Sequence, residues 1–459
     1  MIVAGAALAP PAAAVTGPGV YGFGGNTFGE LGNGTTTASL TPVPAIGLPG
    51  TVRQIAAGYR MSAALLSDGT VWTWGNNGQG QLGYSVAGNV LTPRQVPGLA
   101  GIVQIAAGDG GDGYAVGSDG SVWAWGANNY GQLGNGTTTP STVPIKVPGL
   151  TGVTKVAAGS YNDVLALMSN GTVRAWGEND GELGDGTTTT RLSPVVVQGL
   201  SGITQIATGR TSYAVRSDGT LFSWGDNALG QLGKGTTGSF TTRAAAVPGL
   251  TGVTQVATDG LTTLAVAGTN QRLWAWGDNI CGQLGDGTTT SKSSPEQIGL
   301  VGVTQVAVGV TYLLHQSSAA VRFDGSLWTW GGNGFGQLGH GPVGALTTTP
   351  VAVSNLANVS QFVFGDDSPG GPHGGSYGLA IGSLSAVVPN LIGDTRAQAS
   401  AALQAAGLVL GTVSMVVDST CANIGTVVSQ NPGPGTTLLQ GSSVNIAIGT
   451  SPPPPRQCL

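Results

Sequence analysis

Histidine is scarce in this sequence, and its three copies do not form a catalytic pattern. They are His315, His340 and His373, and they stand at unrelated places in the chain. No His-x-x-His pair, Ser/His/Asp order or P-loop accompanies them. The acidic residues fall mostly in turn sequences, so no pair of carboxylates suited to acid–base chemistry is indicated. We therefore expect a protein with no catalytic residues and no cofactor.

Two Gly-rich acidic segments are the candidates for metal chemistry. The first contains Asp109 and Asp112, and the second begins with Asp366 and Asp367. Carboxylate and backbone carbonyl oxygens are the ligands that Ca²⁺ takes in proteins. Neither segment has the spacing of an EF-hand loop. Two interpretations stay open, a weak calcium site and a pair of flexible loops without metal.

The three cysteines are too few and too far apart for a clustered thiolate metal site. In an oxidising compartment Cys421 and Cys458 could form a disulfide, and the alternative is two free thiols. Cys281 stands where other copies of the repeat described below carry a large apolar residue. Its expected role is that of a small hydrophobic side chain.

Charge and hydropathy restrict the classes of partner that the protein is expected to bind. Only 8% of the residues are charged and the formal net charge is −5, with the basic residues scattered singly, so nucleic acid binding is not expected. No apolar run reaches the roughly 20 residues of a membrane-spanning helix. Residues 1–14 are small and apolar and end in three alanines, which suits a secretory cleavage site, although a basic start is missing. This leader is interpreted as an incomplete export signal or as a disordered Ala/Pro-rich segment.

A repeat of about 50 residues organises most of the chain. Its signature is W-G-x-N followed by G-[QE]-L-G, and the opening glycine of the second motif recurs at intervals of 49 to 54 residues. Several short strand patterns per unit and the absence of helical periodicity indicate propeller blades. The structural tryptophans are Trp74, Trp125, Trp176, Trp224, Trp276 and Trp330, and a degenerate first copy lacks the tryptophan.

Each unit predicts the same succession of strands. A small-residue strand such as Gln54 to Gly58 suits the crowded propeller axis. The next strand ends in an Asp-Gly or Asn-Gly turn, and the third alternates so that Trp72 and Trp74 share one face between blades. The leucine of G-[QE]-L-G is expected to pack into the neighbouring blade. A run of threonines is predicted to form the polar outer strand.

The two ends of the array predict a closed ring of seven blades. The chain enters at a Trp-type strand, residues 19–24, with no small-residue strand before it. It leaves at residues 361–365 and 377–381, which have no Trp-type strand after them. If these half-blades pair, they make a seventh blade and leave no exposed edge strands. The predicted fold is an all-β seven-bladed β-propeller closed by its N- and C-terminal half-blades, over residues 15–384.

The W-G-x-N-x-x-G-Q-L-G and I-A-A-G strings resemble the regulator of chromosome condensation repeat family. The founding function of that family is guanine nucleotide exchange on a small GTPase, and the resemblance therefore implies a regulatory exchange factor as one alternative. The repeats themselves report the fold and not the activity.

A different pattern occupies residues 385–450. It consists of three motifs in order, V-P-N-L-x-G, A-x-x-x-L-x-x-x-G-L and G-x-V-x-x-Q-x-P-x-x-G. This pattern resembles a PASTA domain, a small α+β fold. Thr395 and Gln398 form a capping box for one amphipathic helix, and strands are expected at 408–417, 425–430 and 443–448. The resemblance implies a place outside the membrane of a bacterium, with muropeptide binding and a spacer role both open. A Pro-rich tail follows at 451–459.

These observations favour a non-catalytic binding protein of the bacterial cell envelope or exterior, with cytoplasmic residence as the alternative. One propeller face would bind a protein or a cell-wall glycan, and the PASTA-like domain would associate with the wall. A monomer is expected. The candidate contact residues follow the small-residue strands and vary between repeats; they are Tyr59, Arg60, Tyr161, Asn162, Arg210 and Tyr213.

Overall fold

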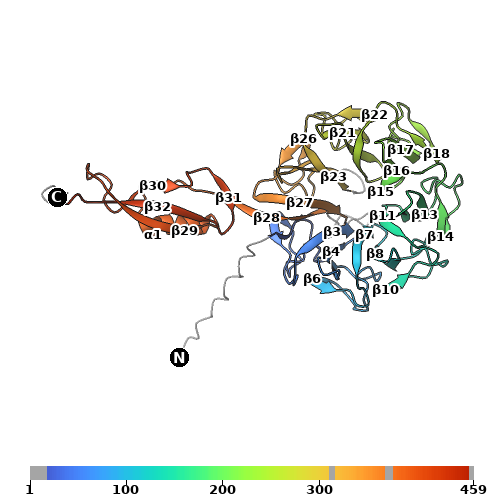
Figure 1. Cartoon of the computed structure of the whole chain (residues 1–459), viewed down its shortest axis with the longest axis horizontal. Coiled ribbons are helices and arrows are strands. Elements are labelled where there is room, and N and C mark those ends of the chain that lie inside the picture. Colours follow the sequence, from blue (N-terminus) through green and yellow to red (C-terminus); the bar gives the residue numbers. More distant parts are fainter. Residues whose placement is uncertain (1–17, 310–315, 367–375, 454–459) are drawn as a thin grey trace. The chain divides into compact units, whose positions relative to one another are not determined.

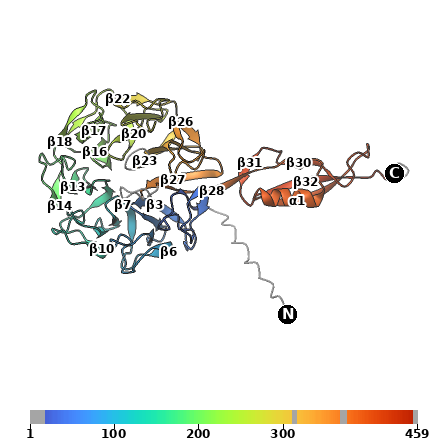
Figure 2. The same cartoon turned by 180° about the vertical axis from the view of Figure 1, so that it is seen from behind.

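A computed structural model describes residues 18–309, 316–366 and 376–453. The described residues divide into two compact units, one from Gly19 to Gly382 and one that includes the chain from Ser383 onward. In the first unit seven sheets of four antiparallel strands are arranged in a ring, with the first strand of each sheet innermost (Figures 1 and 2). No helix in the described part of the chain is long and apolar enough to cross a membrane.

The four strand positions of the propeller recur in each sheet. The innermost strands are β3 (Val52–Gly58), β7 (Ile102–Gly108), β11 (Val153–Ala158), β15 (Ile203–Ala207), β19 (Val253–Thr258), β23 (Val303–Gly309) and β27 (Leu356–Gly365). The second strands are β4 (Met61–Leu66), β8 (Asp112–Gly117), β12 (Asp163–Met168), β16 (Thr211–Arg216), β20 (Thr262–Ala267), β24 (Ser317–Arg322) and β28 (Tyr377–Val387). The third strands are β5 (Val71–Gly75), β9 (Val122–Gly126), β13 (Val173–Gly177), β17 (Leu221–Asn227), β21 (Arg272–Gly277), β25 (Leu327–Gly332) and β1 (Gly19–Gly24). The outer strands are β6 (Val90–Gln95), β10 (Ser141–Lys146), β14 (Arg191–Val196), β18 (Gly238–Ala246), β22 (Lys292–Gln297), β26 (Leu346–Ala352) and β2 (Ser39–Pro44).

The ends of the propeller chain meet in one sheet, as the half-blade pattern predicts. Strand β1 pairs antiparallel with β28, from Gly19 opposite Gly382 to Gly24 opposite Tyr377. The order of this sheet is β2-β1-β28-β27, so the chain's first strand supplies the third position and its late strands supply the first two. The register is continuous over six residue pairs, which leaves neither strand as a free edge.

Small side chains let the innermost strands converge on the axis. Where β15 ends, an added Cβ on Gly209 would lie 2.8 Å from the backbone nitrogen of Gly260 in the next sheet. Only glycine permits that approach. Glutamines then join the sheets: the Gln54 side chain accepts from the N–H of Ile105 at 3.0 Å and donates to its carbonyl at 2.9 Å.

The tryptophans and leucines of the signature fill the spaces between sheets. Trp74 is fully buried with Leu31 of the preceding sheet, and the half-buried Trp72 packs against the same cluster. The two indoles therefore share one face, as predicted, and the leucine packs into the neighbouring blade. The Trp125 Nε1 also donates to the Gln81 carbonyl of the preceding sheet at 2.8 Å. The indole therefore supplies both apolar area and a hydrogen bond to a buried backbone group.

In the four copies where the threonine run follows an Asn-Gly or Asp-Gly turn, it ends before the outer strand begins, so the prediction is wrong there. The threonines at 347–349, in contrast, lie in the outer strand β26. Strand β10 begins at Ser141, after the threonines at 137–139. Their carbonyls accept from the Asn128 side chain, at 3.0 Å for Thr137 and 2.9 Å for Thr139, while Asn128 Oδ1 accepts from the N–H of Leu133 at 2.9 Å. The threonines are thus held in a loop by the asparagine of W-G-x-N, and this explains why both motifs recur together.

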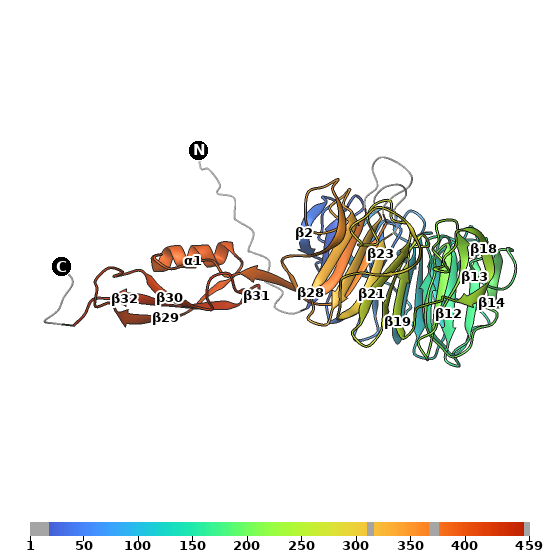
Figure 3. The same cartoon turned by 90° about the horizontal axis from the view of Figure 1, so that it is seen from above.

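The second unit is a three-stranded sheet with one helix on one face (Figure 3). Its order is β29-β32-β30, where β29 (Val409–Val417) runs parallel to β32 (Ser443–Thr450) and β30 (Val427–Asn431) runs antiparallel to it. Helix α1 (Arg396–Ala405) begins with the predicted capping box: Thr395 N donates to Gln398 Oε1 at 2.9 Å, and Thr395 Oγ1 accepts from Gln398 N. A short strand that the sequence did not predict, β31 (Thr437–Leu439), pairs with the end of β28.

The structure tests the predictions for Cys281 and Cys421. Cys281 is 1% exposed and packs as a small buried side chain, as expected. Cys421 takes part in a disulfide. Cys458, its proposed partner, lies outside the described residues, as do residues 1–14 and most of the Pro-rich tail.

Candidate binding face

The antiparallel strands give the propeller two different ends. The tight turns between second and third strands lie at one end, which we call the turn end. The connections from first to second strands and from third to outer strands lie at the opposite end, which we call the loop face. Five of the six predicted contact residues belong to the connections of the loop face; they are Tyr59, Arg60, Tyr161, Asn162 and Arg210.

Tyr213 does not belong to this face, and its assignment as a contact residue is corrected. It is the third residue of β16, is fully buried, and packs with Trp276 of the next sheet at 6.1 Å between ring centroids. Its hydroxyl donates to the carbonyl oxygen of Gln231. Strand alternation turns this side chain into the core between sheets. Tyr114 occupies the matching place in β8 and is equally buried.

Arg60 forms the first aromatic cluster of the loop face. Its guanidinium lies 4.3 Å from the ring centroid of Phe28 and 4.7 Å from that of Tyr59. The backbone of Arg60 adopts a φ of 55°, and its N–H donates to the Asp366 carbonyl at 2.6 Å. Arg60 and Tyr59 are half-buried. A planar cation held over two rings in a fixed backbone conformation is an ordered, partly apolar feature.

A second cluster lies where two neighbouring sheets meet. Arg210 lies 4.5 Å from the ring centroid of Tyr161, and its Nη1 is 3.8 Å from Asp226 Oδ2. Beside it, Asn162 Nδ2 donates to Glu178 Oε2 at 2.9 Å. The structure therefore brings together three of the predicted residues, Tyr161, Asn162 and Arg210.

Tyr161 and Arg210 line a pocket of about 480 Å³. Four carboxylates and two aromatic rings line it together with Arg210; they are Glu178, Asp180, Glu182, Asp226, Tyr161 and Phe240. Glu182 is 4% exposed, and burial is the largest cause that raises its pKa above the ordinary range. Phe240 is 50% exposed although it is large and apolar. We call this feature the acidic pocket.

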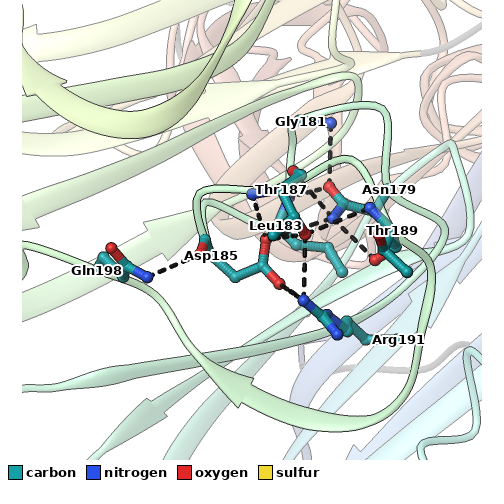
Figure 4. Close-up of polar contacts among 8 residues, drawn as sticks. All are labelled: Asn179, Gly181, Leu183, Asp185, Thr187, Thr189, Arg191 and Gln198. Atoms are coloured by element: carbon teal, nitrogen blue, oxygen red, sulfur yellow. Dashed lines mark hydrogen bonds and ion pairs between the residues drawn. The ribbon is translucent and has the colours of Figure 1, made fainter.

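A hydrogen-bonded loop holds the acidic side of the pocket in place (Figure 4). Asn179 Oδ1 accepts from the N–H groups of Gly181 and Leu183, at 3.0 and 3.3 Å, so the chain turns tightly between Glu178 and Glu182. Asp185 accepts from the N–H of Thr187 at 2.9 Å and from Arg191 Nε at 2.7 Å. Glu182 also belongs to this scaffold, because its Oε2 accepts from the N–H of Asp180 at 2.7 Å, as Gln132 Oε1 accepts from Tyr130 in the preceding blade. The Asp180 side chain is not among these scaffold contacts.

Sequence reasoning missed Glu178, Asp180, Glu182, Asp226 and Phe240. A signal for the first three was present: this copy reads E-N-D-G-E where its neighbour before it reads A-N-N-Y-G-Q. Phe240 gave no local signal, because it reaches the pocket by packing over Gly181 of the preceding sheet.

The predicted calcium residues come close together around the propeller axis. Burial raises the pKa of Asp109 well above its usual value, and repulsion from Asp366 and then Asp112 adds to this. Burial likewise raises the pKa of Asp112 to about 7. In the described part of the chain no group of three or more His, Cys, Asp or Glu side chains is arranged to hold a metal ion. Asp367 lies outside the described residues.

One of the three histidines, His340, lies in the described part of the chain. His340 is half-buried, its Nε2 donates to the Thr329 carbonyl at 3.2 Å, and burial lowers its pKa. His315 and His373 lie outside the described residues.

Comparison with known families agrees with this geometry. The RCC1-like domain matches residues 2–256, more than half of the chain, and the regulator of chromosome condensation (RCC1) repeat matches residues 270–314 and 324–368. The chain belongs to the RCC1-like family. The PASTA domain matches residues 386–450, so an RCC1-like propeller and a PASTA domain occur in one chain.

The relatives of this RCC1-like chain have different names and sizes. It is 33% identical to the ultraviolet-B receptor UVR8 of Arabidopsis thaliana over 297 residues, which are 63% of this chain and 67% of the receptor. It is 38% identical over 228 residues to the E3 ubiquitin-protein ligase HERC2 of Homo sapiens, which are 48% of this chain but 5% of the ligase. This chain therefore spans only a small part of that relative.

Solved structures give the same fold. The RCC1-like chain is similar to Prp20p of Saccharomyces cerevisiae with a TM-score of 0.68 and 23% identity, covering 80% of this chain and 92% of Prp20p. Human WBSCR16 gives a TM-score of 0.68 at 24% identity, covering 79% and 99%. At these sequence identities the similarity shows a shared propeller fold and does not identify a binding partner.

Proposed function

We propose that this RCC1-like chain is a non-catalytic binding protein of the bacterial cell envelope or exterior, whose loop face binds a protein partner. The observation that carries the proposal is the pair of Arg–aromatic clusters on one face, Arg60 over Phe28 and Tyr59, and Arg210 over Tyr161. Tyr and Arg anchors are typical of binding hot spots. None of these five residues is part of the recurring signature that builds the blades.

The turn end holds two Arg–aromatic contacts among the described residues, and both are longer than those of the loop face. The guanidinium of Arg216 lies 5.3 Å from the Phe222 ring centroid, and Arg216 is paired with Asp218 at 2.7 Å. The most exposed aromatic of the turn end is Phe323, 72% exposed, which lies 5.8 Å from the guanidinium of Arg322 in an isolated turn. Arg322 is itself paired with Asp324 at 3.1 Å. The contrast between the two ends supports the loop face as the binding side.

A photo-crosslinking residue placed at Tyr59 tests the proposal in the native host, and the same residue at Phe323 is the matched control. We expect a specific adduct from position 59 and none from position 323. The purified partner should then bind the full chain, and R60A should weaken that binding at least tenfold. Equal adducts from both positions, or unchanged affinity of R60A, would contradict the proposal. Faster nucleotide release from a captured GTPase would instead support the exchange-factor alternative.

The PASTA domain is proposed to associate with the cell wall. Binding of the full chain to purified peptidoglycan sacculi, measured by co-sedimentation and competed by soluble muropeptides, tests this role. Retention no greater than on cellulose would refute it and leave a spacer role. Export is a separate part of the proposal. It predicts that protease added to spheroplasts with an intact cytoplasmic membrane digests the native protein. A cytoplasmic marker protein should be protected in the same sample.

A further inference from the structure

The acidic pocket carries more negative charge than the propeller scaffold requires. Its lining holds three acidic side chains that are exposed or half-buried, Glu178, Asp180 and Asp226, beside one cation, Arg210. The fourth acid, Glu182, is buried, and burial raises its pKa, so it is not counted in this charge. The Arg210 guanidinium is already shared between the Tyr161 ring and Asp226. Asp180 is exposed, and only its backbone N–H is used locally, by donation to Glu182 Oε2 at 2.7 Å. The Asp180 carboxylate is therefore available to a group that enters the pocket.

The repeat supplies a comparison for the positions of Glu178 and Asp180. The residue before the G-[QE]-L-G motif is Asp180 here, and in the other copies it is Phe28, Gln79, Tyr130, Leu229, Cys281 or Phe335. The position of Glu178, directly after W-G, is acidic in three copies, Glu178, Asp226 and Asp278, and in the others it is Gly25, Asn76, Ala127 or Gly332. A similar loop, one residue longer, forms after Asn76 and Ala127, where the asparagine of W-G-x-N accepts from the leucine N–H five positions further on instead of four. Asp180 has an uncharged counterpart in every other copy, so its charge is an addition to the blade and not a part of it.

Phe240 completes the pocket with an aromatic wall. It packs over Gly181, where an added Cβ would lie 3.0 Å from the ring. At the same contact in the other blades the glycine meets a non-aromatic side chain; these are Leu40, Leu91, Thr142, Leu192, Ser293 and Thr348. Tyr161 supplies a second ring. A cation beside these groups is attracted by the quadrupole of the aromatic rings and also by the negative charge of the carboxylates.

We propose that the acidic pocket receives a lysine or arginine side chain of the protein partner, with the cationic group at Glu178 and Asp180 and its apolar stem along Phe240. Charge complementarity selects this occupant, because a partner's acidic or neutral side chain would leave the carboxylates uncompensated. Long basic side chains also cover apolar surface with their methylene groups, which matches the half-exposed ring. The volume of about 480 Å³ lies within the range of ligand pockets. This inference rests on the proposed function of the loop face.

Capped tripeptides Gly-Arg-Gly and Gly-Lys-Gly are the probes, with Gly-norleucine-Gly as the neutral control, titrated into the full chain by NMR. We expect the basic peptides to bind and the neutral one not to bind. The double variant E178Q/D180N should weaken binding at least tenfold. Its matched control is D68N/D119N, which removes the same charge from exposed turns at the turn end. F240S should weaken binding severalfold, and its control L40S, at the corresponding contact of another blade, should not.

Two results would overturn the inference: equal binding of the neutral peptide, or equal losses in D68N/D119N, which would indicate non-specific attraction to the whole chain. Thermal unfolding of each variant shows whether the fold is intact. The two proposals fail separately. If the partner captured at Tyr59 binds E178Q/D180N normally, the pocket inference is wrong and the loop face stands. If basic peptides bind but no partner contacts Tyr59, the proposed function is wrong.

Discussion

The side chain of Gln361 forms two hydrogen bonds with the backbone of Ile55, 306 positions away in the sequence. Its Oε1 accepts from the Ile55 N–H at 2.8 Å, and its Nε2 donates to the Ile55 carbonyl at 3.0 Å. The same pair of hydrogen bonds joins the side chain of Gln104 to the backbone of Val156, and the side chain of Gln305 to the backbone of Phe362. The innermost strand of the last blade, β27, is thus linked to that of the first, β3, by the same glutamine–backbone hydrogen bonds that link consecutive blades.

Q361A should destabilise the propeller as much as Q104A does. Each variant leaves a backbone N–H and a carbonyl without the glutamine partner, and a lost buried hydrogen bond costs about 1–3 kcal/mol. Urea denaturation followed by tryptophan fluorescence measures both. A neutral Q361A beside a destabilised Q104A would show that the first and last blades are not joined in solution.

K155Q should stabilise the propeller. Lys155 occupies the place that glutamine holds in Gln54, Gln104 and Gln205, and its exposed side chain makes no corresponding link to β15. A glutamine there would reach the backbone of Ile206 and add about 1 kcal/mol. K155A is the control, because it removes the charge without adding an amide. Equal unfolding midpoints for K155Q and K155A would contradict the expected link.

W125F should cost more stability than W276F. Both indoles are buried and donate to a carbonyl of the preceding sheet, Trp125 to Gln81 and Trp276 to Gln231, at 2.8 Å each. The Gln231 carbonyl also accepts from the Tyr213 hydroxyl, so it keeps a partner when the indole is lost. The Gln81 carbonyl would be left unsatisfied, at a cost of about 1–3 kcal/mol. Paired denaturation curves check the difference, and equal losses would argue against it.

Acidification from about pH 8 to about pH 5 should stabilise the propeller. Burial raises the pKa of Asp112 and of Asp259 to about 7, and a carboxyl group of an unfolded chain titrates near 3.9, about three units lower. Between these values the folded chain binds more protons than the unfolded one. The contribution to the free energy of unfolding is therefore fully present below the unfolded pKa and is lost as the pH rises through about 7.

The variant D112N/D259N separates this effect from other titrations. Each unit of pKa difference is worth about 1.4 kcal/mol, so the double variant should show a clearly shallower dependence of the melting temperature on pH. His340 acts in the opposite direction, because its lowered pKa reduces stability as the pH falls through the range of histidine. An unchanged slope in D112N/D259N would show that these carboxyls do not titrate near neutrality.

The recurring part of the fold could be predicted because it is local and repeated. The Trp-Gly motif, the Asp-Gly turns and the small-residue strands each mark one strand position, and the unmatched strands at residues 19–24 and 361–381 indicated how the ends pair. The capping box at Thr395 and Gln398 was likewise readable, because its two hydrogen bonds join residues three apart. The threonine run was misassigned in four copies because β-propensity does not distinguish a strand from a loop held by a side chain.

The sequence by itself determined the blade, its number of copies and the second domain, since these follow from periods and short-range motifs. Only the tertiary structure decided which side chains share a surface. It turned Tyr213 into the core, brought Arg210 over Tyr161, and placed Phe240 across Gly181 in another sheet. Such contacts depend on the strand register and on the curvature of the ring, which place residues about 50 positions apart side by side. A repeat signature is the same for every blade and cannot carry that information.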